Sequence, residues 1–169
     1  RQWVLSFPYP LRFLLASNPQ VVTKVLGIVN RVIATHLTKK TGFKKATAHT
    51  GAVTLIQRFG SALNLNLHFH VLFIDGVYQQ KNNGKLRFHR VNAPTANELN
   101  TLVATISQGV ALHLERQGLL TRDDESSYLT LDLQDDDAMN QLQGHSITYR
   151  IAVGPQQGRK VFTLQTIPS

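Results

Sequence analysis

One alternating stretch, from Leu63 to Ile74, constrains the fold more than any other part of the chain. Successive side chains on a β-strand point to opposite faces, so residues two apart share a face. Every odd position from Leu65 to Phe73 is apolar, which predicts a buried strand face. The even positions are, in order, Asn64, Asn66, His68, His70, Leu72 and Ile74. The stretch therefore predicts a central strand whose second face begins polar and ends apolar.

His68 and His70 share that second face, about 6.6 Å apart at the rise of an extended strand. Two imidazoles at this spacing can converge on one metal ion. The wetted face of an antiparallel sheet would carry the same residues without any chemistry. A solvated face usually recruits charged residues, however, and none occurs between Ala62 and Ile74. We expect a shallow, partly desolvated pocket around the two histidines.

The chain has 169 residues, enough for one domain with a substantial core and a small appendage. It contains no Cys, which excludes disulfide bonds and thiolate metal sites. No apolar run approaches the ~18 residues of a membrane span, and no signal-peptide pattern is present. We therefore expect a cytoplasmic protein without membrane association. Because Arg1 already lies in a strand-like run, we expect the chain to be part of a longer one.

Positive charge is concentrated in the first part of the chain. Residues 1–122 hold 15 Lys and Arg against three acids, whereas residues 123–169 hold three against seven. Solubility alone needs only a few charges. The excess therefore indicates a polyanionic partner, with nucleic acid first and an anionic membrane surface a distant second.

Apolar periodicity and turn signals predict the other elements. They are a strand over 2–7, a helix of about 20 residues that begins near 17–20, strands over 52–59, 77–80 and 86–91, and a helix over about 95–117. Thr95 and Glu98 match a capping box, and Gly118 is placed to end that last helix. This order predicts an α+β fold, a ferredoxin-like antiparallel sheet with helices packed on one face.

Two basic segments are candidates for DNA contact. One is the expected loop over residues 38–50, where lysines surround Phe43, and the other is the hairpin over residues 77–91. Lysines around an aromatic ring suit phosphate contact with base stacking, although a solvated connector accounts equally well for the loop. The candidate DNA contacts are Arg58, Lys39, Lys40, Lys44, Lys45, Lys81, Lys85, Arg87 and Arg90.

The strand before the histidines offers a further ligand. If the turn pairs Phe59 with Asn64, Gln57 lies on the histidine face opposite Asn66, and its amide oxygen is a candidate third metal ligand. A one-residue slip of the register would place Arg58 there instead, where its guanidinium could hold a phosphate through two hydrogen bonds.

The amino-acid composition of the chain changes after residue 120. Acidic residues cluster over 123–137, and residues 145–165 read as a hairpin. Without a Gly-spaced ligand loop, the acidic cluster indicates a solvated surface rather than a metal site. We expect a core over residues 1–120, and over residues 121–169 an acidic segment with a C-terminal hairpin, either an edge extension or the start of a further domain.

The histidine strand and its neighbours resemble a known family. His68-Phe69-His70 on a basic, ferredoxin-like sheet resembles the HUH endonucleases. The run from Gly51 to Tyr78, together with residues 1–6, is similar to the rolling-circle tyrosine transposases of bacterial insertion sequences. The resemblance is close over residues 1–80 and looser beyond.

This resemblance implies DNA transposition by metal-assisted transesterification of single-stranded DNA at element ends. In the family, a tyrosine hydroxyl attacks the scissile phosphate and leaves a free 3′-OH and a 5′-phosphotyrosine. Carried over by position, His68 and His70 are the catalytic metal ligands for Mg²⁺ or Mn²⁺, with Gln57 as the third. The ion would polarise a phosphate oxygen.

The chain departs from the family pattern in two respects. Family nucleophiles usually lie on a helix after the histidine strand, but residues 95–117 contain no Tyr, and the family's cysteine-rich zinc segment has no counterpart. We therefore expect both to lie outside these residues. Two alternatives remain open, a non-catalytic DNA-binding fragment of a decayed transposase and another His-x-His metal-dependent phosphodiesterase. The sequence leaves the oligomeric state open.

Overall fold

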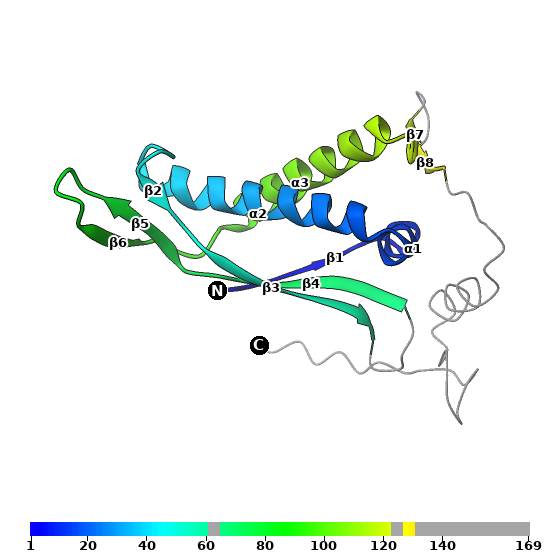
Figure 1. The fold of residues 1–169 in the computed structure, drawn as a ribbon, viewed down its shortest axis with the longest axis horizontal. Coiled ribbons are helices and arrows are strands. Elements are labelled where there is room, and N and C mark those ends of the chain that lie inside the picture. Colours follow the sequence, from blue (N-terminus) through cyan, green and yellow to red (C-terminus); the bar gives the residue numbers. More distant parts are fainter. Residues whose placement is uncertain (61–64, 123–126, 131–169) are drawn as a thin grey trace.

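The computed structural model describes residues 1–60, 65–122 and 127–130. In these residues two helices follow the first strand, five strands come next, and a third helix precedes a final pair of short strands (Figure 1). They are, in chain order, β1 (Gln2–Ser6), α1 (Tyr9–Ser17), α2 (Pro19–Thr41), β2 (Ala48–His49), β3 (Ala52–Phe59), β4 (Leu65–Phe73), β5 (Gly76–Gln80), β6 (Leu86–Arg90), α3 (Ala96–Arg116), β7 (Leu120–Arg122) and β8 (Ser127–Leu129).

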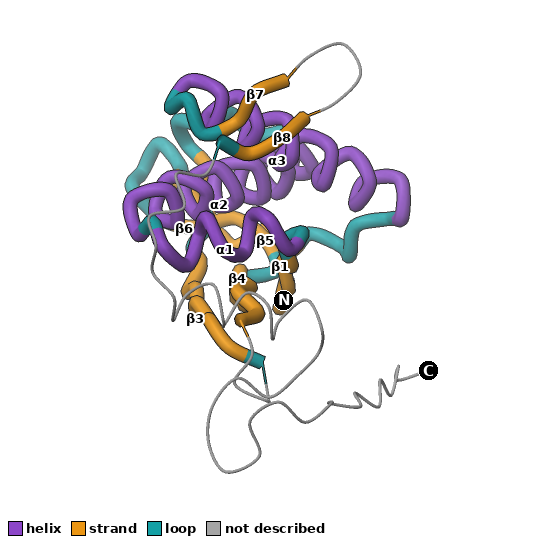
Figure 2. Tube along the Cα trace, turned by 90° about the vertical axis from the view of Figure 1, so that its right-hand side faces the viewer, coloured by secondary structure: helices purple, strands orange, loops and turns teal. Residues whose placement is uncertain are grey.

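The main strands form two small antiparallel sheets. One has the order β1-β4-β3 and the other the order β2-β5-β6, and the chain passes from β4 to β5 through a bend at Asp75. Helices α1 and α2 lie on one side of the strands, with α3 alongside α2 (Figures 1 and 2). The predicted α+β class with helices on one face is therefore confirmed, but the predicted single sheet is divided in two by the bend.

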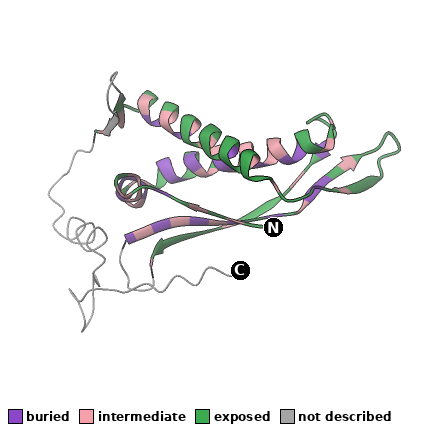
Figure 3. Cartoon of the chain, turned by 180° about the vertical axis from the view of Figure 1, so that it is seen from behind, coloured by how far each residue is buried: buried purple, intermediate pink, exposed green. Residues whose placement is uncertain are grey.

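The core lies between α2 and the odd-numbered face of β4. Leu67, Phe69 and Val71 are completely buried, as the alternating pattern predicts. Figure 3 shows buried and intermediate positions alternating along β4. The Phe69 ring meets Phe7 edge to face, with centroids 5.1 Å apart. From α2, the buried side chains are Val21, Val22, Val25, Val29, Ile33, Leu37 and Thr38. Full burial of one such aliphatic side chain contributes roughly 1.5–3 kcal/mol, so this interface fixes β4 and the face it exposes.

Helix α2 is long and apolar enough, by length and composition alone, to cross a membrane. The expectation that no segment reaches that length is therefore wrong for residues 19–41. A core helix meets the same criterion, and Val25 and Val29 of α2 are completely buried within the fold.

Two elements were not expected from the sequence. The sequence predicts no helix directly after the strand over 2–7, because Pro8 and Pro10 are typical of a strand end. The structure has α1 from Tyr9, since proline is well suited to the first turn of a helix. Residues 38–50 were expected to form a loop, yet α2 continues to Thr41 and residues 48–49 form β2. That short strand forms by pairing with β5, and no local sequence pattern predicts it.

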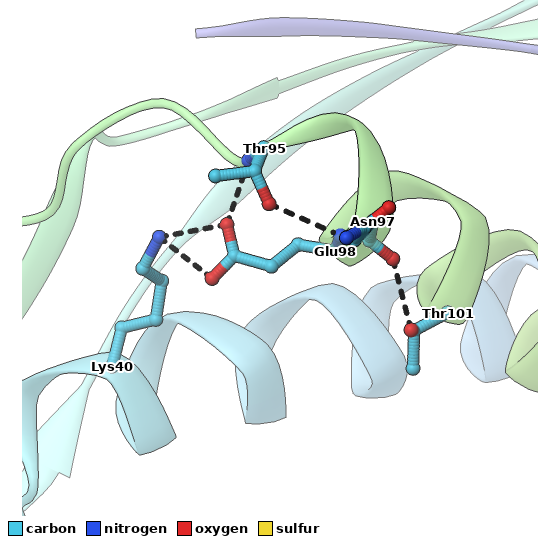
Figure 4. Close-up of polar contacts among 5 residues, drawn as sticks. All are labelled: Lys40, Thr95, Asn97, Glu98 and Thr101. Carbon is cyan, nitrogen blue, oxygen red and sulfur yellow. Dashed lines mark hydrogen bonds and ion pairs between the residues drawn. The ribbon is translucent and has the colours of Figure 1, made fainter.

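The predicted capping box of α3 is present. Thr95 Oγ1 accepts from the Glu98 backbone N–H at 3.3 Å, while the Glu98 carboxylate accepts from the Thr95 backbone N–H at 2.7 Å (Figure 4). The same carboxylate pairs with Lys40 Nζ at 2.8 Å. Gly118, with a φ of 69°, follows the helix end as predicted. The Lys40–Glu98 pair thus joins the end of α2 to the start of α3.

Beyond α3, the described residues contain the small β7–β8 hairpin. The predicted acidic cluster over 123–137 and the predicted hairpin over 145–165 lie outside the described residues, apart from 127–130. The division of the chain at residue 120 stays a prediction.

Candidate metal and DNA site

His68 and His70 lie side by side on the face of β4 that the helices leave open. Their ring centroids are 4.8 Å apart and their ring planes meet at 65°. Both residues are partly buried, between the fully buried odd positions of the same strand. The alternating pattern therefore places the two imidazoles together, as the sequence predicted.

A hydrogen bond determines which ring nitrogen of His68 carries the proton. His68 Nδ1 lies 2.7 Å from the Asn66 backbone oxygen. A carbonyl oxygen only accepts, so Nδ1 carries the proton and donates it, which leaves the Nε2 lone pair of a neutral ring available for a metal. This is the arrangement in which metal-binding histidines are usually held.

His70 has a partner that the sequence did not predict. Gln2 Nε2 of β1 lies 2.8 Å from His70 Nδ1. When this amide nitrogen donates, the neutral ring carries its proton on Nε2. A half rotation of the carboxamide brings Oε1 to the same place, moves the ring proton to Nδ1 and frees Nε2 for a metal. The Gln2 side chain can therefore set which nitrogen of His70 faces outward.

The register of β3 places Gln57 directly opposite His68, with Ser6 of β1 opposite His68 on the other side. The predicted pairing of Gln57 with Asn66 is wrong by two residues. Phe59 pairs with Leu65 and not with Asn64, and the irregularity between Gln57 and Phe59 shifts the register by one residue more. A shift of two keeps the same face, so Gln57 remains beside the histidines. Gln57 Nε2 donates to the Phe59 backbone oxygen at 3.1 Å.

Arg58 is the next residue of β3 and lies at the irregularity of the pairing, between Gln57 and Phe59. Its guanidinium reaches the Ala16 backbone oxygen of α1 at 3.4 Å. The alternative in which Arg58 takes the place of Gln57 on the histidine face is therefore wrong.

The surroundings of the histidines are more open than a pocket. His70 is flanked by Val4 and Leu55, which are 57% and 61% exposed, and Leu72 beyond it is 47% exposed. Among the described residues, these aliphatic side chains form an open apolar surface around His70 and do not enclose it. A long, flexible substrate could lie across such a surface.

The metal-ligand set is incomplete among the described residues. Residues 1–60, 65–122 and 127–130 contain no group of three or more His, Cys, Asp or Glu side chains that could hold a metal ion. Two imidazoles and the amide oxygen of Gln57 are a mixed nitrogen and oxygen donor set that can bind a divalent ion, and they leave coordination positions open. The residues therefore fit a divalent ion through His68 and His70, with a third ligand from Gln57 or from outside the described residues.

The predicted basic contacts are on the surface, at the other end of the sheets. Those from α2 and the segment after it are Lys39, Lys40, Lys44 and Lys45, and those from the hairpin are Lys81, Lys85, Arg87 and Arg90, all exposed. Lys40 differs from the others because its ammonium is paired with Glu98. That hydrogen bond, with the one from the Thr95 backbone, lowers the pKa of Glu98 to about 2.

Two comparisons place this fold among known proteins. Residues 51–164, more than half of the chain, match the family described as "Putative transposase". The structure is similar to that of the conjugative relaxase TrwC in complex with oriT DNA, in a metal-free structure, with a TM-score of 0.53 and 11% sequence identity. That match covers 88% of this chain and 55% of the relaxase chain. The chain thus spans just over half the length of that protein.

A second relaxase structure also covers 88% of this chain and 55% of its own. It is TrwC with a mutant oriT DNA, with a TM-score of 0.48 and 12% identity. No protein of curated function matches the chain. At these identities the structural likeness concerns the fold alone, whereas the family match concerns the sequence. The chain therefore belongs to the transposase family that matches residues 51–164, and its α+β fold is similar to that of the conjugative relaxase TrwC.

Proposed function

We propose that this chain is the metal- and DNA-binding core of a transposase that nicks single-stranded DNA and transfers the cut strand through a tyrosine. Membership of a transposase family supports a role in DNA transposition. The single observation that carries the finer proposal is the pairing of His68 and His70 on an open strand face, with ring centroids 4.8 Å apart.

The two histidines hold the ion through their Nε2 atoms. The Asn66 backbone oxygen orients His68, and Gln2 orients His70 when its amide oxygen accepts from Nδ1. When bound, Mg²⁺ or Mn²⁺ supplies a Lewis acid that polarises a non-bridging oxygen of the scissile phosphate. The described residues directly beside His70, Val4 and Leu55, carry no charge, so neither side chain repels the phosphate.

The nucleophile comes from a segment other than the described helices after β4. Helix α3 contains no tyrosine, and Tyr78 lies about 26 Å along the chain from His70 at the rise of an extended strand. Tyr9 is in α1, with Arg12 over its ring, and Tyr128 pairs with Thr121 in the β7–β8 hairpin. We propose that the tyrosine lies outside these 169 residues. Its hydroxyl oxygen forms the new bond to phosphorus as the bond to the 3′ oxygen breaks.

Titration of the purified chain with Mn²⁺ and with a labelled single-stranded oligonucleotide tests this function. The chain should bind both and should not cleave the DNA. Cleavage that is lost in Tyr128→Phe or Tyr149→Phe would contradict the external nucleophile.

The double variant His68→Ala/His70→Ala separates the alternatives. It should lose Mn²⁺ binding and the Mn²⁺-dependent part of single-strand affinity, whereas His113→Ala, on α3, should lose neither. DNA binding that is independent of the ion and of both histidines would indicate a non-catalytic DNA-binding module. Metal binding without preference for single strands would indicate another phosphodiesterase.

A further inference from the structure

Three aromatic side chains line up across the second sheet. The register pairs His49 of β2 with Tyr78 of β5, and Tyr78 in turn with Phe88 of β6. All three are exposed, with Tyr78 at 44% and Phe88 at 42%. We call His49, Tyr78 and Phe88 the aromatic row.

The geometry of the aromatic row is fixed by its own contacts. The Tyr78 and Phe88 rings lie with centroids 5.1 Å apart and planes tilted by 52°. A Cβ atom on Gly76 would come within 2.8 Å of Phe88 Cζ, so the glycine allows the Phe88 ring to lie against the strand. The rings are therefore positioned by the sheet before any ligand arrives.

The exposure of the row is not required by the fold. The opposite face of the same sheet supplies the buried side, where Val77 is completely buried and β5 contacts α2. On the open face, Leu86 is 62% exposed next to the two rings. An apolar patch that is left open in this way usually marks a binding surface.

The charge around the patch identifies the class of ligand. The sequence from Gly76 to Pro94 contains no Asp or Glu, and it holds Lys81, Lys85, Arg87 and Arg90. An apolar protein partner would not need this excess of cations, whereas single-stranded nucleic acid offers both bases to stack and phosphates to pair. We propose that the aromatic row is a stacking platform for the bases of single-stranded DNA, with the neighbouring cations along its backbone.

This surface is continuous with the histidine site. Alternation puts His68, His70 and Leu72 on the face away from the helices, and after the bend the same side carries Tyr78. Eight residues of extended chain span at most about 26 Å, so one strand of DNA could run from the aromatic row to the histidines. The platform rests on the proposed function in that both assume single-stranded DNA as the ligand.

The test compares two oligonucleotides of equal length, oligo(dT) and the same backbone with abasic sites, by fluorescence anisotropy on the full chain. Tyr78→Ala and Phe88→Ala should each weaken oligo(dT) binding by about 5- to 150-fold, the range for losing one base stack. Binding of the abasic strand and of duplex DNA should not change. Leu112→Ala, which removes an exposed aliphatic side chain of α3 outside this sheet, is the matched control and should bind like the wild type.

Conservative variants guard against a folding effect. Tyr78→Phe and Phe88→Trp keep a ring and should retain oligo(dT) affinity. An equal loss of affinity for the abasic strand, unchanged affinity for oligo(dT), or a change of oligomeric state in place of DNA affinity would overturn the proposal.

The platform and the proposed function can fail separately. Row variants that bind oligo(dT) like the wild type, in a chain that still binds Mn²⁺ through His68 and His70, would overturn the platform alone. If the wild-type chain binds no metal, and the row variants still lose base-dependent DNA affinity, the platform is supported and the metal-dependent function is overturned.

Discussion

Gln57 stands directly across from His68 in the antiparallel pair of β3 and β4. Directly opposed side chains on one sheet face have Cβ atoms about 4.5–5.5 Å apart, close enough for a carboxamide and an imidazole to bind one ion. The residue on the other side of His68 is Ser6, whose short hydroxyl reaches less far. This difference between the two neighbours gives a direct test of the third ligand.

Gln57→Ala should weaken Mn²⁺ binding to the chain, and Gln57→Glu should strengthen it, since a carboxylate adds charge to the same donor position. Isothermal titration calorimetry measures both. Ser6→Ala is the matched control on the opposite neighbour of His68 and should keep the wild-type affinity. If Ser6→Ala weakens binding and Gln57→Ala does not, Gln57 is not a ligand.

Gln2 should matter through His70 rather than by direct contact with the ion. Removing the outer partner of a metal-binding histidine typically costs about 10- to 100-fold in metal affinity, and we expect a loss in this range for Gln2→Ala. In ¹⁵N NMR spectra of the chain with its histidines neutral, Gln2→Ala should also change the proportion of the two His70 tautomers.

Gln79 provides the control, since its Oε1 lies 3.1 Å from His89 Nε2, away from the histidine face. Gln79→Ala should leave both the Mn²⁺ affinity and the His70 tautomers unchanged. A wild-type tautomer ratio in Gln2→Ala would contradict the role of Gln2.

The salt dependence of DNA binding should show which Lys and Arg side chains contact DNA phosphates. For single strands, log K falls with log salt concentration by about 0.7 for each neutralised phosphate. Lys81→Ala and Lys85→Ala should each reduce the slope by up to about 0.7. Lys24→Ala, on the exposed side of α2, should leave it unchanged. Equal effects of all three substitutions would show that only the total charge matters.

Acid should weaken the junction between α2 and α3. The Lys40 ammonium and the Thr95 backbone N–H lower the pKa of Glu98 from 4.5 to about 2. A depressed carboxyl pKa stabilises the fold above the ordinary value, and this contribution is lost as the pH falls from 4.5 towards 2. Urea unfolding across this range should show a flatter pH profile for Glu98→Gln than for the wild type.

His36 titrates in a different range. Burial is the main cause that lowers its pKa below 6.5, so its unfavourable effect appears as the pH falls below that value. The charge of Glu98 raises the pKa of His36, so Glu98→Gln also changes the contribution of His36, and the same comparison in a His36→Asn background removes it. Identical profiles of the two proteins between pH 4.5 and 2 would contradict the assigned role of Glu98.

The site was predictable from the sequence where it depends on local patterns. Alternation alone determines that His68 and His70 share a face and that Phe69 between them is buried. Capping chemistry likewise predicted the start of α3 at Thr95, because the partners lie three residues apart.

Residues that depend on pairing between strands were not predictable in the same way. Gln2 meets His70 only because β1 pairs with β4 across 68 residues of sequence, and the sequence does not give that register. The irregularity after Gln57 changed its partner but preserved its face. The aromatic row was missed for the same reason, since His49 and Tyr78 become neighbours only through the β2–β5 pair.

The central claim is that His68 and His70 hold one divalent ion on the open face of β4. Anomalous diffraction from crystals of the chain soaked in Mn²⁺ tests it most directly. The account predicts one strong anomalous peak within bonding distance of Nε2 of both rings, about 2.0–2.2 Å. A well-occupied Mn²⁺ site elsewhere in the chain, with no anomalous density between the two histidines, would contradict it.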